Sequence, residues 1–329
     1  MCRSFPGLFT DENGNEINSG RFNWGVYSIN LVRAAIEAHG DEKKFFKALD
    51  VVLQDIYELT KIKFNILKKV KAKQAPILYM SGAIARLNAE DTIEPLLLDN
   101  YSSVSVGYVG LSNCLAALYG EGLENQNYDI VAKGAKIMQY IRDWCDKMKK
   151  ETRIGFSMYG TPAETLATKF CAEDVKDFGV IKGVNDQGYY ENSFHYPSNH
   201  EISPFDKLDL ESNLNHISSG GVISFVELGD MNHNLEALED IIRYAYTKTP
   251  FLGISTISDH CLECGYTGEI KSVDEEGYVF ECPNCHNRNK MTLSIIRKLC
   301  GYLGSIFERP TASGKMLEIK HRVDNKISK

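Results

Sequence analysis

The sequence predicts an α/β protein with parallel strands, followed by a small cysteine-rich region. Runs rich in β-branched and aromatic residues alternate with helical patterns over the first 255 residues. This alternation is typical of a parallel sheet whose strands are joined by helices. Beyond residue 255, glycines, cysteines and short β stretches replace the long helices. A chain of 329 residues is long enough for one large or two medium domains, each with a real core.

The composition indicates a globular protein without a nucleic-acid surface. Hydrophobic residues make up 43% and charged residues 25% of the chain, which are ordinary values. The net charge of −7 argues against nucleic acid as the main partner, because phosphate binding needs basic stripes. No apolar run approaches the roughly 18 residues of a membrane span, and the N-terminal stretch has no apolar signal core. We therefore expect a cytoplasmic protein that binds neither membranes nor nucleic acid.

The first strands and helices follow in order. Residues 21–30 (RFNWGVYSIN) are rich in strand formers, and residues 31–40 form a short helix that ends at a glycine. Residues 41–71 carry apolar side chains at helical spacing, so we expect a long amphipathic helix there. Residues 102–110 (SSVSVGYVG) form a second strand, and residues 111–120 (LSNCLAALYG) form the helix after it.

The alternation continues toward the cysteine-rich region. Residues 128–149 form another amphipathic helix, and residues 153–160 (RIGFSMYG) form a third strand that leads into a helix from Thr161. Residues 220–228 (GGVISFVEL) form a fourth strand, and residues 235–246 form the helix after it. We place a domain boundary near residue 255, where this pattern stops.

Four cysteines have the spacing of a metal site. Cys261 and Cys264 form one C-x-x-C pair, Cys282 and Cys285 form a second, and seventeen residues separate the pairs. Each pair can present two thiolates from a tight turn, and four sulfurs with no open position are typical of structural zinc. The alternatives are a redox dithiol, unrelated core cysteines, or an iron site, because sulfur ligands also suit iron. We predict a zinc ribbon over residues 256–291.

A glycine-rich segment follows the cysteines. The stretch RKLCGYLGSIFERP, residues 297–310, has Gly301 and Gly304 on either side of a tyrosine and a leucine, directly after Cys300. Nothing in it predicts a helix, although its apolar content is high for a mobile tail. Paired glycines are common in turns, so the segment by itself fits a simple turn as well as a specialised glycine.

This segment and its surroundings resemble a known enzyme family. CGYLG, followed by RP and then GKMLEIKHRV, looks like the C-terminus of the anaerobic (class III) ribonucleotide reductases, and its first glycine lies sixteen positions after Cys285. Other segments resemble the family in the same order, so the resemblance covers essentially the whole chain. These segments are CRSF (2–5), GRFNWGVYSINL (20–31), YGTPAETLATKFC (159–171), FGVIKGVNDQGYYENSFHYP (178–197), FDKLDLE (205–211) and DMNHNLEAL (230–238).

The resemblance implies radical chemistry at three positions. In the family the glycine after the cysteine, here Gly301, carries a stable radical, since an α-carbon without a side chain becomes planar and delocalised between two amides. The thiyl-forming cysteine maps onto Cys2, and the active-site asparagine maps onto Asn23, whose amide would hydrogen-bond the ribose hydroxyls. The thiyl radical would abstract the ribose 3′-hydrogen of a ribonucleoside triphosphate, the 2′-hydroxyl would leave, and formate would be the reductant. A radical S-adenosylmethionine activating enzyme would generate the glycyl radical.

The segment Thr161-Pro162-Ala163-Glu164 is a candidate phosphate site. We interpret it as the start of a helix with proline in its first turn, where backbone N–H groups and the helix dipole attract an anion. Thr161, Ala163 and Glu164 are therefore the predicted substrate-binding residues. Alternatively, Thr161 merely caps the helix while Glu164 completes a capping box.

The resemblance also implies that the chain is half of an enzyme. Family members are about twice this length, judged from the family pattern. Residues 1–255 would form the second half of a ten-stranded α/β barrel of two five-stranded parallel sheets. Residues 256–291 would be the zinc ribbon, and residues 292–329 the glycyl radical loop and tail. Because Met1 directly precedes Cys2, without the glycine usual in the family, we expect a split or interrupted enzyme that needs its N-terminal half and forms a homo-oligomer.

Two other functions stay open at this stage. An orphaned, non-catalytic fragment would act as a zinc-binding structural or interaction module. Another glycyl radical enzyme, such as a formate-lyase relative, is the enzymatic alternative, and the zinc pairs count against it. The presence of Cys2, Asn23, Gly301 and the four zinc-type cysteines favours the reductase.

Overall fold

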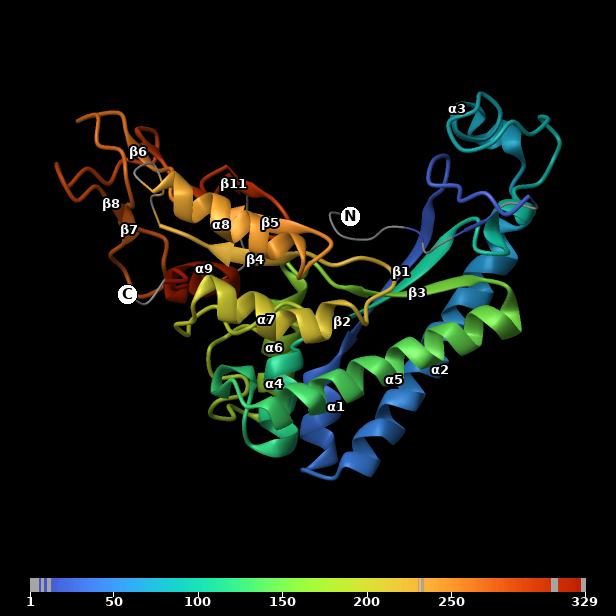
Figure 1. Ribbon diagram of the computed structural model, residues 1–329, viewed down its shortest axis with the longest axis horizontal. Helices are drawn as coiled ribbons and strands as arrows, with labels where there is room; N and C mark the ends of the chain where they lie inside the picture. The colour runs from blue at the N-terminus through green and yellow to red at the C-terminus, as the bar shows by residue number, and fades with distance from the viewer. Residues whose placement is uncertain are drawn as a thin grey trace.

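The larger part of the protein is an α/β arrangement, which confirms the predicted fold class. The structure is a computed structural model that describes residues 6, 9–10, 13–229, 231, 234–308 and 313–326. Figure 1 shows the sheet of β1, β2 and β3 in the centre of the view, with the cysteine-rich part at the far side of β4 and β5. No helix in these residues is long and apolar enough to cross a lipid bilayer.

Three parallel strands form the main sheet. They are β1 (Asn23–Asn30), β2 (Ser103–Val109) and β3 (Gly155–Gly160), in the spatial order β1-β2-β3. Every residue of β2 and β3 is buried, as expected for parallel strands covered on both faces. β1 is the edge strand of this sheet, and Val26 on it is 38% exposed.

A second pair of parallel strands lies next to β3. β4 (Ser224–Glu227) pairs with β5 (Leu252–Ser255). Main-chain bonds join the end of β3 to the residues just before β4: the Gly160 N–H donates to the Gly221 carbonyl at 3.0 Å, and the Gly220 N–H donates to the Met158 carbonyl at 2.6 Å. The strands therefore adjoin in the order β1 to β5 along the chain.

Long helices cover one side of the main sheet. α1 (Leu31–Ala38), α2 (Glu42–Leu67), α4 (Leu111–Tyr119) and α5 (Tyr128–Thr152) lie together below it in Figure 1. The other helical segments are α3 (Pro76–Tyr79), α6 (Leu166–Phe178), α7 (Pro204–Asn215), α8 (Leu235–Tyr246), α9 (Ser313–His321) and the short 3₁₀ turns η1 (Ala72–Gln74), η2 (Glu94–Leu97) and η3 (Leu123–Asn125).

Sequence features account for the long helix α2. Its N-cap residue Asp41 accepts hydrogen bonds from the backbone N–H groups of the first turn, which satisfies donors that a helix start leaves unpaired. Buried apolar residues recur at Phe45, Leu49, Leu53 and Ile56, one stripe of the helix. This stripe packs α2 against α1 and against β1, the first strand of the sheet.

Short antiparallel strands and one helix form the cysteine-rich part. β6 (His260–Cys261) pairs with β9 (Leu293–Ser294), β7 (Lys271–Ser272) with β8 (Phe280–Glu281), and β10 (Ile296–Lys298) with β11 (Leu303–Ser305). These strands and α9 share one hydrophobic cluster. Its buried members are Cys261, Ile270, Phe280, Cys282, Leu293, Ile295, Leu299, Ile306, Met316 and Ile319.

Two interpretations of the helix after β3 were wrong: that it starts at Thr161, and that Thr161 caps it. The helix after β3 begins at Leu166, with Thr165 as its N-cap, and not at Thr161. The Ala163 N–H instead donates to Asn192 Oδ1 at 2.7 Å, which holds residues 161–164 outside the helix. Thr161 therefore does not cap this helix.

The sequence analysis did not predict α7, β5 and α9. α7 carries Lys207 and Glu211 as a buried ion pair, so charged residues occupy positions that face the core and hide its apolar period. β5 has only four residues, and α9 carries buried Lys315 and Glu318 in the same way. Short length and buried charge explain why these elements left no clear pattern.

We predict that Gly107→Ala destabilises the fold. A Cβ at this position of β2 would overlap Thr161 Oγ1 and the Tyr159 ring, and overpacking of this kind costs about 1–3 kcal/mol. Urea denaturation of the chain measures the change in the free energy of unfolding. Gly229→Ala is the matched control, because its Cβ would meet its nearest neighbour, Asp324 Oδ2, at an ordinary 3.4 Å. Equal stability of the two variants would contradict the close approach of β2 and Thr161.

Candidate functional site

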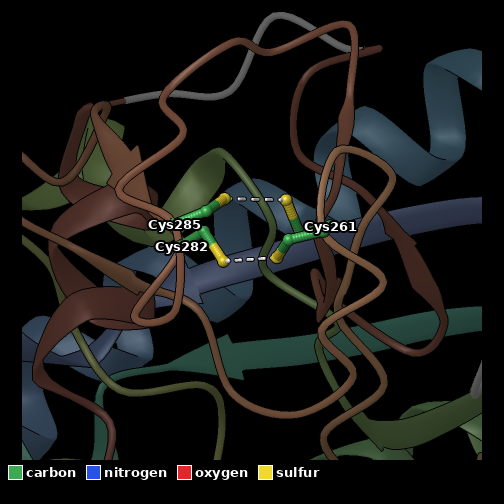
Figure 2. A group of neighbouring side chains, drawn as sticks. Cys261, Cys282 and Cys285 are labelled. Atoms are coloured by element: carbon green, nitrogen blue, oxygen red, sulfur yellow. Dashed lines mark hydrogen bonds between the residues drawn. The ribbon is translucent and has the colours of Figure 1, made fainter.

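The four zinc-type cysteines form one cluster. Their Sγ atoms all lie within 4.8 Å of one another. Figure 2 shows sulfurs of the two pairs facing each other across the site, with Cys261 Sγ 3.7 Å from Cys285 Sγ and Cys264 Sγ 3.6 Å from Cys282 Sγ. Thiolates about 2.3 Å from a tetrahedral zinc lie about 3.8 Å apart. The two short distances match this value, and the cluster as a whole has the size of a four-sulfur zinc site.

The two cysteine pairs lie on equivalent turns. The Gly265 N–H donates to the Cys261 carbonyl at 2.9 Å, and the His286 N–H donates to the Cys282 carbonyl at 3.0 Å. Gly265 and His286 both have a positive φ, 74° and 59°, which the turn needs in order to bring back the chain after the second cysteine. The same local geometry thus presents each pair of sulfurs.

Hydrogen bonds prepare one ligand to ionise. Burial raises the pKa of the Cys261 thiol, but the Asn287 amide and the backbone N–H groups of Cys264 and Glu263 outweigh burial and lower this pKa to about 6. Asn287 Nδ2 lies 3.6 Å from Cys261 Sγ. A thiolate is the form that binds metal. The Asn287 N–H lowers the pKa of Cys285, but burial and the neighbouring cysteines raise it to about 12, so without a metal only part of the cluster is favoured as thiolate.

A buried aspartate joins the cysteine cluster to the glycine segment. The fully buried Asp259 accepts the N–H groups of Ile270 at 2.9 Å and Ile296 at 3.1 Å, and it pairs with the Arg297 guanidinium. Arg297 Nη2 also donates to the Ile270 carbonyl at 2.8 Å. The turn before the first cysteine pair is therefore bonded to β10, the strand that leads to Gly301.

Gly301 lies in the turn of a β-hairpin. Lys298 of β10 pairs with Leu303 of β11, and the Leu299 N–H donates to the Tyr302 carbonyl at 3.0 Å. Cys300 and Gly301 are the two residues between Leu299 and Tyr302. Cys300 is buried and Gly301 is half-buried. The predicted radical glycine is thus held in a tight, partly enclosed turn.

Buried charges hold the base of this hairpin. Lys298 pairs with Glu227 at the end of β4, and Arg322 donates to the Lys298 carbonyl at 3.0 Å and to Glu318 Oε1 at 2.7 Å. Burial lowers the pKa of Lys298 well below its usual value. Burial raises the pKa of Glu318, but the charges of Arg322, Lys315 and Lys298 outweigh it and hold that pKa low. Glu318 is therefore an ionised carboxylate, paired with Lys315 and Arg322.

Glu191 is a buried carboxyl beside the same network. Burial, and then the charge of Glu318, raise its pKa to about 7, while the Ser198 N–H, 3.2 Å from Glu191 Oε1, acts in the opposite direction. It lines a small cavity of about 30 Å³ together with Lys298 and Glu318. The charges of Lys298 and Lys315 act against burial but do not outweigh it, so Glu191 titrates near neutral pH.

The predicted phosphate segment lies at the carboxyl end of β3. Thr161 Oγ1 lies 3.1 Å from Ser28 Oγ, and the Ala163 N–H is held by Asn192. The carboxylate of Glu164 accepts a hydrogen bond from the Tyr302 hydroxyl, at 3.0 Å. The structure therefore brings the segment next to the hairpin turn of Gly301.

Asn23 lies at a β-bulge at the start of β1. Its Nδ2 donates to Ser105 Oγ, and its Oδ1 accepts the Gly25 N–H at 3.1 Å. The register shifts by one residue between Asn23 and Gly25, and bulges of this kind redirect side chains beside active sites. Since Ser28 contacts Thr161, Asn23 lies five residues, or roughly 16 Å, from that contact along the strand. Cys2 lies outside the described residues.

Sequence reasoning missed the contacts that link these positions. Tyr302 belongs to the quoted glycine motif and Asn192 to a quoted family segment, but neither carried a predicted role. Their partners are 138 and 29 residues away in the chain. A tyrosine directly after the predicted radical glycine was the available signal for the first of these contacts.

Comparison with known proteins identifies relatives over nearly the whole chain. The family model described as anaerobic ribonucleoside-triphosphate reductase matches residues 1–324. The anaerobic ribonucleoside-triphosphate reductase of Escherichia coli (strain K12) is 43% identical over 323 residues, which are 98% of this chain and 45% of that protein. The chain therefore spans about half the length of the curated relatives it matches.

Solved structures share the fold. An anaerobic ribonucleotide reductase has a TM-score of 0.68 at 17% identity, over 98% of this chain and 48% of its own. The glycerol-bound B12-independent glycerol dehydratase from Clostridium butyricum has a TM-score of 0.59 at 12% identity, over 95% of this chain and 45% of its own. Because the fold extends to a dehydratase, the family match and not the fold separates the reductase from other enzymes.

We predict that Cys261→Ser removes bound zinc. A serine hydroxyl does not ionise to replace the thiolate, so the metal content should fall from about one zinc per chain to near zero. Elemental analysis of the purified chain measures it. Cys114→Ser is the control, since Cys114 is a buried cysteine of α4 outside the cluster. Full zinc content in Cys261→Ser would rule out the four-sulfur site.

We predict that Glu191→Gln gains stability relative to the wild-type chain as pH rises. The pKa of this carboxyl is raised from 4.5 to about 7 by folding, so between these pH values the folded state binds the extra proton. Wild-type stability therefore falls with rising pH in this window, by an amount on the order of 3 kcal/mol, and glutamine does not titrate. Urea denaturation of both proteins at pH 5 and pH 7.5 compares them. A difference that is independent of pH would contradict the raised pKa.

Proposed function

Because the chain belongs to the anaerobic ribonucleoside-triphosphate reductase family, we propose that it is one half of an enzyme that reduces ribonucleoside triphosphates to deoxyribonucleotides. The observation that carries the proposal is the family match over residues 1–324, together with a glycine held in a tight hairpin turn at Gly301. The chain covers 45% of the length of its Escherichia coli relative, and the N-terminal half of the reductase would complete the enzyme.

We propose that residues 1–255 form half of a ten-stranded α/β barrel. The order of five strands, β1 to β5, supports this, since β1 remains an edge strand that a further strand can pair with. Residues 256–291 would be the zinc ribbon, and residues 292–329 the glycyl radical loop and tail. The ribbon would hold the hairpin in place through Asp259 and Arg297.

The proposed chemistry uses Gly301 and Cys2. An activating enzyme of the radical S-adenosylmethionine type would remove one hydrogen atom from the Gly301 α-carbon. The glycyl radical would take the hydrogen atom of the Cys2 thiol, and the resulting thiyl radical would abstract the ribose 3′-hydrogen. The 2′-hydroxyl leaves as water after protonation, and formate supplies two electrons and becomes carbon dioxide. The Cys2 thiol then returns its hydrogen atom to C3′, which restores the thiyl radical, and this radical takes back the hydrogen atom of the Gly301 α-carbon.

The proposed substrate contacts lie at the two ends of the sheet. Asn23 would bind the ribose hydroxyls through its amide, a neutral donor and acceptor. The backbone of Thr161, Ala163 and Glu164 would face the phosphates, with the first turn of α6 behind it, because the first N–H groups of a helix have no intrahelical partner. The Ala163 N–H would exchange its bond to Asn192 for a phosphate oxygen.

The metal and the partners complete the proposal. Zinc held by the four cysteines would be structural, since four sulfurs leave no open position for substrate. We also propose a cytoplasmic homo-oligomer that includes the N-terminal half. The substrate's base would be selected in that half.

We predict an oxygen-sensitive glycyl radical at Gly301. The chain, with and without the N-terminal half, is activated anaerobically with the activating enzyme and S-adenosylmethionine, and its paramagnetic spectrum is recorded. A doublet signal, followed by cleavage at Gly301 in air, is expected in the mixture and is expected to vanish in Gly301→Ala. Gly304→Ala is the matched control, because it alters the second glycine of the motif and keeps Gly301.

The outcomes separate the candidate functions. A signal only with the N-terminal half supports a split enzyme, and a signal in the chain alone shows that this half suffices for activation. No signal in either mixture, with zinc bound and the fold verified, would overturn the reductase in favour of a non-catalytic zinc-binding module.

A further inference from the structure

The hairpin that carries Gly301 has a second attachment at its tip. The Tyr302 hydroxyl donates to Glu164 Oε1 at 3.0 Å, in a partly buried position. Tyr302 directly follows Gly301, so their α-carbons are about 3.8 Å apart. The base of the hairpin is held by the Lys298 network. The hydrogen bond of Tyr302 therefore acts at the turn itself, which the contacts at the base of the hairpin restrain least.

The acceptor is held rigidly on its own side. Pro162, two residues before Glu164, restricts its own backbone and that of Thr161, and the Ala163 N–H is bonded to Asn192 at 2.7 Å. Thr161 contacts Ser28 of β1 at 3.1 Å. The backbone beside Glu164 is thus held against the sheet by bonds that do not involve the hairpin.

The chemistry of Glu164 also suggests a role apart from the substrate. A carboxylate repels phosphate, so the side chain of Glu164 is poorly suited to bind a triphosphate directly. The side chain faces the hairpin, and its backbone remains beside the substrate segment.

We propose that the Tyr302–Glu164 hydrogen bond positions Gly301 against the substrate segment. The inference rests on the proposed function, because it assigns Tyr302 and Glu164 as positioning residues for the radical at Gly301. Hydrogen-atom transfer requires close approach, and a displacement of about 1 Å can lower a rate about 100-fold. Loss of the bond leaves the glycine able to carry a radical and takes it out of its working position.

The first experiment measures the position of the turn without any radical. Hydrogen exchange of the backbone amides from Leu299 to Leu303 is followed in the whole chain for Tyr302→Phe and Glu164→Ala. Each should exchange about tenfold faster at the turn, in line with the loss of one hydrogen bond to a charged group. Tyr244→Phe is the matched control. Tyr244 of α8 also donates to a carboxylate, that of Asp209 on α7 at 2.7 Å, and this bond does not involve the hairpin. Unchanged exchange at the turn would overturn the proposal.

The second experiment measures chemistry per radical. In the activated mixture of the two halves, Tyr302→Phe should keep the Gly301 doublet and form about 10- to 100-fold less deoxynucleotide per spin. Glu164→Gln keeps an oxygen acceptor and should recover most of the yield that Glu164→Ala loses. The double variant Tyr302→Phe with Glu164→Ala should lose no more than either single variant, because both remove one interaction.

The outcomes keep this inference apart from the proposed function. Wild-type yield per spin in Tyr302→Phe would refute the positioning role while the reductase stands. If the variants exchange faster at the turn but the wild-type mixture gives no doublet, the positioning contact stands and the radical function is refuted.

Discussion

Lys298 is buried between Glu227 of the sheet and the α9 region, and the placement of the whole glycine segment depends on this paired charge. Arg322 bonds to the Lys298 carbonyl and to Glu318, so sheet, hairpin and C-terminal helix meet in one network. A buried pair adds little net stability, but removal of one partner costs about 3–5 kcal/mol because it leaves a charge unpaired. The network therefore specifies one position for the hairpin more than it strengthens the fold.

The cysteine cluster depends on the same arrangement from the other side. Asp259, two residues before Cys261 in the chain, bonds to Ile296 and Arg297 of β10. The short strands around the cysteines and α9 share one hydrophobic cluster. A small unit of short strands buries too little apolar surface to be rigid by itself. A four-sulfur metal site would supply the missing rigidity and pass it to the hairpin through Asp259.

Local patterns allowed much of the fold to be predicted. Periodicity located α2 and α8 correctly, and a continuous run of strand formers located β2. Both α2 and β2 bury apolar side chains along much of their length. α7 was missed because Lys207 and Glu211 are buried as a pair on it. The start of α6 was misplaced because Asn192, far along the chain, binds the Ala163 N–H and keeps the preceding residues out of the helix.

The sequence by itself determined which four cysteines come together, because two C-x-x-C pairs form equivalent local turns whose geometry depends on few neighbours. It also determined the family, through motifs along the whole chain. The tertiary structure decided how the glycine turn is held. Tyr302 and Glu164 lie 138 residues apart, and Lys298 and Glu227 lie 71 apart. Contacts of such separation depend on the packing of strands and helices between them, which no local spacing in the chain records.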